Sequence, residues 1–99
     1  MAKIAWTSEA QRWLRDIHNY IASDNPDAAE RVALEIHDSV RVLHEHPRVG
    51  QRYPYVTDRE VRILHYSHYR IAYLIRKKTG DIDILGIFHG ALPIERYLL

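Results

Sequence analysis

Residues 60–89, EVRILHYSHYRIAYLIRKKTGDIDILGIFH, decide the fold of this chain. Apolar, β-branched and aromatic residues recur there with a period of two, which is typical of β-strands. The pattern predicts strands at residues 61–65, 69–75 and 82–88, separated by short polar turns. Because the connections are short, the three strands should form an antiparallel meander.

Both faces of this meander carry apolar side chains. Ile71, Tyr73 and Ile75 share one face of the middle strand, and Ala72 and Leu74 share the other. One face can therefore pack on helices. The other face needs cover from the preceding loop, from the C-terminal tail or from a partner.

The sequence before the meander predicts a strand and a helix. Residues 2–6 read as a short strand, and apolar residues between Ala10 and Ile21 recur at helical spacing. Thr7 or Ser8 can cap this helix, and Ser8 with Gln11 matches a capping box.

A second helix should begin at Pro26, with Asn25 as its N-cap, and end at His46-Pro47. Few residues separate the two helices, so they should form an antiparallel hairpin. Leu34 and Val42 lie off the apolar stripe of the second helix, where they can touch either the sheet or a partner.

The predicted order is β-α-α-β-β-β, an α+β fold in which a helical hairpin packs on a small antiparallel sheet. A chain of 99 residues predicts one domain, spanning residues 1–99. Residues 47–59, with two Pro and one Gly, should form a loop, and residues 93–99 can form a last helical turn.

Composition excludes several kinds of site. The chain has no Cys, so it has no disulfide, no thiol nucleophile and no cysteine-based zinc site. It also lacks a signal pattern and any apolar run near the roughly 18 residues of a membrane span, so we expect a cytoplasmic protein without a membrane partner. Among seven His, His44 and His46 lack the i, i+4 spacing of helical metal pairs, and His65 and His68 flank a turn. We expect no metal and no cofactor.

Charge is divided unevenly along the chain. Residues 1–46 carry five basic and eight acidic groups, and residues 47–99 carry nine basic and five acidic groups, although the total charge is only +1. Such asymmetry favours a charged partner for the basic half. The expected target-binding residues are Arg48, Arg52, Arg59 and Arg62.

Arg70 and His89 are the candidate catalytic pair. Arginine offers a planar fork for phosphate and histidine exchanges protons near neutral pH, so the two together could cleave RNA without a metal. The alternative is structural: Arg62 and Arg70 can brace loops or pair with Glu60 or Asp83, and His89 can bond to a backbone carbonyl.

An ordered set of motifs covers nearly the whole chain. The motifs are Tyr20-Ile21-Ala22, Asn25-Pro26-Asp27-Ala28-Ala29, Leu43 to Gly50 with its Pro47, Arg62-Ile63-Leu64, Tyr69-Arg70-Ile71-Ala72-Tyr73, and Ile84 to Gly90. The set resembles the ParE/RelE toxins of type II toxin–antitoxin modules, whose fold has the same order of elements.

Function divides within the family that the chain resembles. RelE-like members are ribosome-dependent mRNA endonucleases, and those with an Arg–His site place these residues where Arg70 and His89 stand. Here Gly90 replaces the aromatic residue that follows the histidine, and the loop at 47–59 offers no matching catalytic Glu or Lys. The resemblance is therefore closer to ParE, which implies an inhibitor of DNA gyrase active in growth inhibition and plasmid stabilisation. The alternatives are a metal-independent endoribonuclease using Arg70 and His89, and a binding module without toxicity.

The resemblance also implies a partner. Toxins of this family are held by a small antitoxin, with a helix in the groove of the helical hairpin and an extended part at a sheet edge. Trp13, Leu34 and Val42 are the expected antitoxin-binding residues, although Trp13 can also belong to the core. Oligomers would then form through the antitoxin complex.

Overall fold

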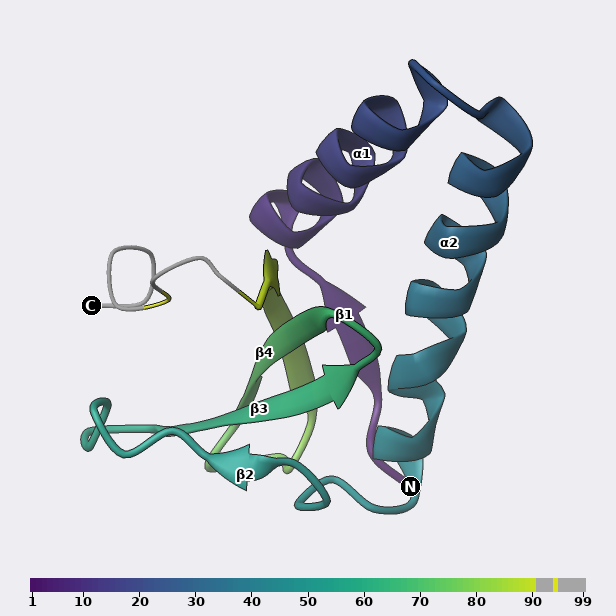
Figure 1. Ribbon diagram of the computed structural model, residues 1–99. Helices are drawn as coiled ribbons and strands as arrows, with labels where there is room; N and C mark the ends of the chain where they lie inside the picture. Colours follow the sequence, from purple (N-terminus) through teal and green to yellow (C-terminus); the bar gives the residue numbers. More distant parts are fainter. Residues whose placement is uncertain (91–93, 95–99) are drawn as a thin grey trace.

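The computed structural model describes residues 1–90 and 94 (Figure 1). Its elements are β1 (Ile4–Trp6), α1 (Ser8–Ala22), α2 (Pro26–Ser39), the 3₁₀ helix η1 (Val40–His44), β2 (Gln51–Arg52), β3 (Glu60–Tyr66), β4 (Tyr69–Ile75) and β5 (Ile82–His89). This order confirms the predicted α+β fold with its helical hairpin and its meander. The helical turn expected at 93–99 lies outside the described residues, Ile94 apart.

The five strands form one sheet in the order β1-β5-β4-β3-β2. The sheet is mixed rather than wholly antiparallel, because β1 runs parallel to β5, with Ile4 opposite Ile82. The helical hairpin returns the chain to the start of β1, where the Ala2 N–H donates to the His44 carbonyl at 3.0 Å. Within the meander, β5 runs antiparallel to β4 and therefore parallel to β1.

Polar caps set the starts of both helices. The Thr7 hydroxyl accepts from the Ala10 N–H, so Thr7 is the cap of α1 and the expected Ser8–Gln11 capping box does not form. Gln11 instead donates to the Trp6 carbonyl. Asn25 caps α2 as predicted, accepting from the Ala28 N–H at 3.1 Å.

The second helix was expected to run to His46, but α2 ends at Ser39 and tightens into η1. The Ser39 hydroxyl donates to the Ile36 carbonyl at 2.6 Å, which competes with the helical ladder. Val40 and Leu43 are both buried and lie three residues apart, and the three-residue turn of a 3₁₀ helix places both on the core side.

Buried side chains cover both faces of the sheet. The helix-facing core contains Ile36, Leu43, Tyr73 and Ile84. The opposite core contains Tyr53, Val56, Val61, Ile63, Ala72, Phe88 and Ile94. The second face is therefore covered by the loop before β3 and by Ile94, two of the three kinds of cover that the sequence predicts. The same segment contributes β2, whose two residues pair with β3 within the expected loop.

Candidate functional site

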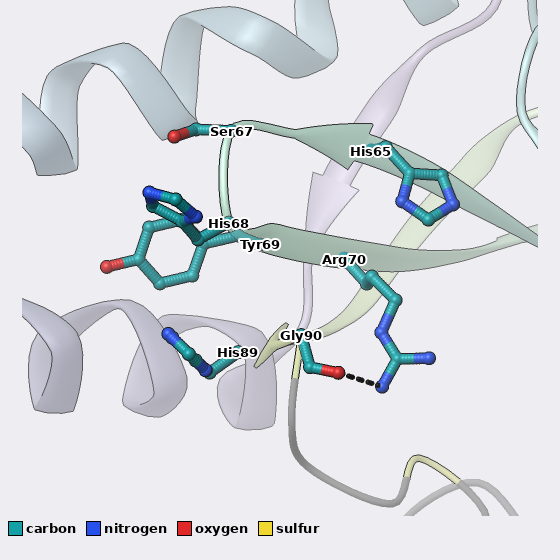
Figure 2. A pocket seen from close by; sticks show the side chains of 7 residues that line it. All are labelled: His65, Ser67, His68, Tyr69, Arg70, His89 and Gly90. Atoms are coloured by element: carbon teal, nitrogen blue, oxygen red, sulfur yellow. Dashed lines mark hydrogen bonds between the residues drawn. The ribbon is translucent and has the colours of Figure 1, made fainter.

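A pocket of about 430 Å³ lies at the end of the β3–β4 hairpin (Figure 2). Its lining residues are His65, Ser67, His68, Tyr69, Arg70, His89 and Gly90. Ser67 adopts a left-handed conformation, with φ of 52°, so that the chain reverses between Tyr66 and Tyr69, which pair directly. Burial raises the pKa of the Tyr69 hydroxyl, which therefore stays protonated at neutral pH.

Arg70 and His89 line this pocket but project from opposite faces of the sheet. Arg70 pairs with Phe88 and His89 pairs with Tyr69, and directly paired residues share a face. The guanidinium of Arg70 donates to the Gly90 carbonyl at 3.2 Å. The His89 ring instead lies beside the Tyr69 ring, with centroids 6.0 Å apart. Figure 2 shows the side chains of Arg70 and His89 pointing in different directions.

The histidines of this pocket do not gather around a point. The rings of His68 and His89 stack at 6.4 Å, whereas His65 lies on the side of Arg70 (Figure 2). Across residues 1–90 and 94, no group of three or more His, Asp and Glu could hold a metal ion.

Arg62 acts as a structural clamp, one of the two roles left open by the sequence. Its Nε donates to Glu60 at 2.7 Å and its Nη1 donates to the Gly50 carbonyl at 2.7 Å. Arg48 approaches the same Glu60 carboxylate with two N–H groups, at 3.0 and 3.1 Å. Burial of the carboxylate opposes its ionisation, but the hydrogen bonds and charges of Arg62 and Arg48 outweigh burial, so the pKa of Glu60 falls below 4.5.

The other three expected target-binding arginines meet in one groove of about 740 Å³, between the 47–59 loop and the β4–β5 turn. We call it the basic groove. Its described lining residues are Arg48, Arg52, Thr57, Asp58, Arg59, Glu60, Leu74, Ile75, Arg76, Lys77, Lys78, Thr79 and Gly80. Arg62 does not line it.

Arg76, Lys77 and Lys78 were not expected in this groove, yet the sequence contains the signal. A two-residue turn after Tyr66 fixes the register of the β3–β4 hairpin. Counted residue by residue from the Tyr66–Tyr69 pair along both strands, this register places Glu60 opposite Ile75. The end of the loop and the β4–β5 turn must therefore meet at the same end of the sheet.

The expected antitoxin-binding residues separate into two groups. The Trp13 ring packs edge-on against Phe88, with centroids 4.9 Å apart, so Trp13 belongs largely to the core. Leu34 and Val42 are exposed, at 65% and 41% of their surface.

A second pocket, of about 470 Å³, is lined by residues of α1 and α2 together with Trp6. Its lining residues are Trp6, Gln11, Leu14, Arg15, His18, Ala33 and His37. Trp6 stacks on His37 with ring centroids 5.2 Å apart. The sequence prediction missed this contact because a strand residue and a helix residue 31 positions apart form it.

Known proteins resemble this chain along almost its whole length. Residues 4–92 match the family model described as ParE toxin of type II toxin-antitoxin system, parDE. The chain is 38% identical over 88 residues to a protein of Sinorhizobium fredii named toxin Y4kP, covering 89% of this chain and 88% of that protein. It is 34% identical over 91 residues to Toxin RelE2 of Caulobacter vibrioides, covering 92% and 98%.

A solved structure agrees with these relatives. A chain of the chromosomal ParDE TA system from P. aeruginosa superposes with a TM-score of 0.70 and 25% identity, covering 90% of this chain and 96% of that one. No helix within the described residues has the length and apolar character of a membrane span. The family match, the relatives and the superposition agree: this chain belongs to the ParE family of toxins of type II toxin–antitoxin systems.

Proposed function

We propose that this toxin inhibits DNA gyrase and is neutralised by a cognate antitoxin that binds the helical hairpin. The observation that carries the first part is the divergence of Arg70 and His89. General-base activation of a 2′-hydroxyl and stabilisation of the phosphate need both groups within reach of one reacting centre. In the β4–β5 register the two side chains leave opposite faces of the sheet, which disfavours a nuclease built from them.

Two exposed apolar side chains support the antitoxin part of the proposal. Leu34 lies in α2 and Val42 lies in η1, and both side chains are exposed although they are apolar. The pocket between α1 and α2 adds an apolar lining from Trp6 and Leu14. An amphipathic antitoxin helix could bury these groups, with the toxin and antitoxin assembling as an oligomer.

A second candidate function is mRNA cleavage on the ribosome. It is favoured by the relative named Toxin RelE2 and by the presence of Arg70 and His89 in one pocket. In this case a movement of the β5 end would have to bring His89 toward Arg70.

One experiment compares these functions. The full chain is induced in bacteria, and growth, plasmid supercoiling and transcript ends are followed together. Gyrase inhibition predicts loss of negative supercoiling with intact transcripts, reversed by co-expression of the antitoxin. The cytoplasm is the expected site of action, because the chromosome is there. Ribosome-dependent cuts that vanish in His89→Ala and Arg70→Ala would instead support the nuclease, and unaffected growth would contradict both.

A further inference from the structure

The basic groove is a concave surface that gathers many charged side chains. Six cationic side chains line it, against two acidic ones, Asp58 and Glu60. Glu60 is already engaged by Arg48 and Arg62, which leaves its charge largely compensated. Arg76 is likewise paired with Asp83, yet the cations still outnumber the acidic groups, so the groove is positive although the whole chain carries a net charge of only +1.

From this geometry we propose that the basic groove binds the phosphate backbone of duplex DNA without sequence preference. The proposal rests on gyrase inhibition, because it would hold the toxin against the DNA on which gyrase acts. Duplex DNA presents a regular row of phosphates, and neutralising them releases bound counterions, which provides binding free energy independent of base sequence.

The groove cations are exposed enough to contact such a row. Arg48 and Arg76 are oriented by Glu60 and Asp83, yet 62% and 57% of their side-chain surface stays exposed. Arg52, Lys77 and Lys78 are exposed and form no salt bridge among the residues that the structure describes. Oriented guanidinium groups with adjacent mobile ammonium groups suit phosphate contacts.

The rest of the lining favours a phosphate backbone over other anionic ligands. Thr57 and Thr79 add hydroxyl donors, which commonly contact phosphate oxygens. The described lining residues include no aromatic ring on which unpaired bases could stack, as single-strand binding requires. The apolar residues of the lining are Leu74 and Ile75, and Ile75 is buried, so only Leu74 of the two could contact the side chains of an acidic peptide.

The test measures binding of the full chain to fluorescein-labelled 20-base-pair duplexes of two unrelated sequences by anisotropy. Both duplexes should bind equally well. With three phosphates neutralised at a slope of about 0.9 each, affinity should fall roughly 40-fold between 50 and 200 mM salt. Lys77→Glu with Lys78→Glu should weaken binding at least tenfold, and Lys77→Gln with Lys78→Gln should weaken it less.

A matched control reverses two charges outside the groove. Arg12 and Arg31 are exposed residues of α1 and α2, so Arg12→Glu with Arg31→Glu changes the net charge equally. This variant should keep wild-type affinity within twofold. All four positions are exposed, and circular dichroism should show that every variant is folded.

Two results with the duplexes would overturn the proposal: no binding at 50 mM salt, or an equal loss of affinity in the two charge-reversal variants. Tighter binding of a 20-nucleotide single strand than of the duplexes would also overturn it, as would tighter binding of a 20-residue polyglutamate peptide. A supercoiling assay with purified gyrase separates this inference from the proposed function. Inhibition of gyrase without DNA binding removes only the inference, whereas DNA binding without inhibition of gyrase removes the proposed function.

Discussion

The hydroxyl of Tyr73 in β4 ties the start of the 47–59 loop to the sheet through Gly50. It accepts the Gly50 N–H at 3.0 Å and donates to the Pro47 carbonyl at 2.8 Å, from a side chain that is fully buried. Burial raises the pKa of this hydroxyl, against a smaller opposing effect of the Gly50 N–H. One residue of the meander thus determines where the loop that carries Arg48 and Arg52 begins.

Tyr73→Phe removes the acceptor of the Gly50 N–H while keeping the ring in the core. A buried donor left without a partner should lower the free energy of unfolding by about 1–3 kcal/mol. Urea denaturation measures the change. Tyr20→Phe, at a residue that is 83% exposed, is the control and should have almost no effect. Equal stability of both variants would contradict the role of Tyr73.

Gly50→Ala tests the close approach of this loop. A Cβ at Gly50 would lie 2.7 Å from the Ile63 carbonyl and 2.7 Å from the Tyr73 hydroxyl, so backbone must shift. The expected loss is about 1–3 kcal/mol, typical of overpacking. Gly90→Ala is the control, because its Cβ would be 3.4 Å from the nearest atom, the His68 carbonyl oxygen, and thermal unfolding should barely change.

Glu60→Gln tests the contacts of Arg62 and Arg48 with the Glu60 carboxylate and their dependence on pH. The pKa of Glu60 is lowered in the folded protein, so its contribution is present above the ordinary value of 4.5 and disappears as pH falls through the lowered folded-state pKa. At pH 7 the variant should lose about 1–2 kcal/mol, and the difference from wild type should shrink below pH 4.5. Denaturation curves at pH 7 and pH 3 measure this, with the exposed Glu45→Gln as control. A difference independent of pH would argue against a charged clamp.

The separation of Trp13 from Leu34 predicts opposite phenotypes. Trp13→Ala should destabilise the toxin by about 2–4 kcal/mol, because its packing on Phe88 is lost. Leu34→Glu should change stability by less than about 0.5 kcal/mol, as expected at an exposed site.

If the antitoxin helix binds α2, Leu34→Glu should weaken antitoxin binding at least tenfold while toxicity persists. Calorimetric titration with the antitoxin measures the affinity, and growth after induction measures toxicity. If the double variant Leu34→Glu with Val42→Glu binds the antitoxin with unchanged affinity, the antitoxin binds a different surface of the toxin.

Local patterns made most of the fold predictable. The two-residue period after Glu60 and the Asn25-Pro26 start of α2 depend on neighbouring residues, and both predictions were confirmed. The parallel pairing of Ile4 with Ile82 was not predictable from such patterns, because strand direction at that edge depends on the path of the whole chain.

The candidate site residues were likewise predictable where their placement depends on local sequence, and unpredictable where it depends on packing. Sequence placed Arg48, Arg52 and Arg59 together, because they share one loop. It could not show that Arg62 would turn to Glu60 and the Gly50 carbonyl, since that choice depends on where the loop packs. The opposite orientation of Arg70 and His89 follows only from the register of β4 with β5, which the irregularity between Ala72 and Tyr73 shifts by one residue.

The pairing of β1 with β5 also determines when the protein can fold. Ile4 leaves the ribosome long before Ile82 has been synthesised, so the first strand has no neighbour while α1 and α2 emerge. Contacts this distant in sequence close slowly and late. We therefore expect the nascent helical hairpin to expose its apolar face from its emergence until β5 has also left the ribosome, and the sheet to be completed only then.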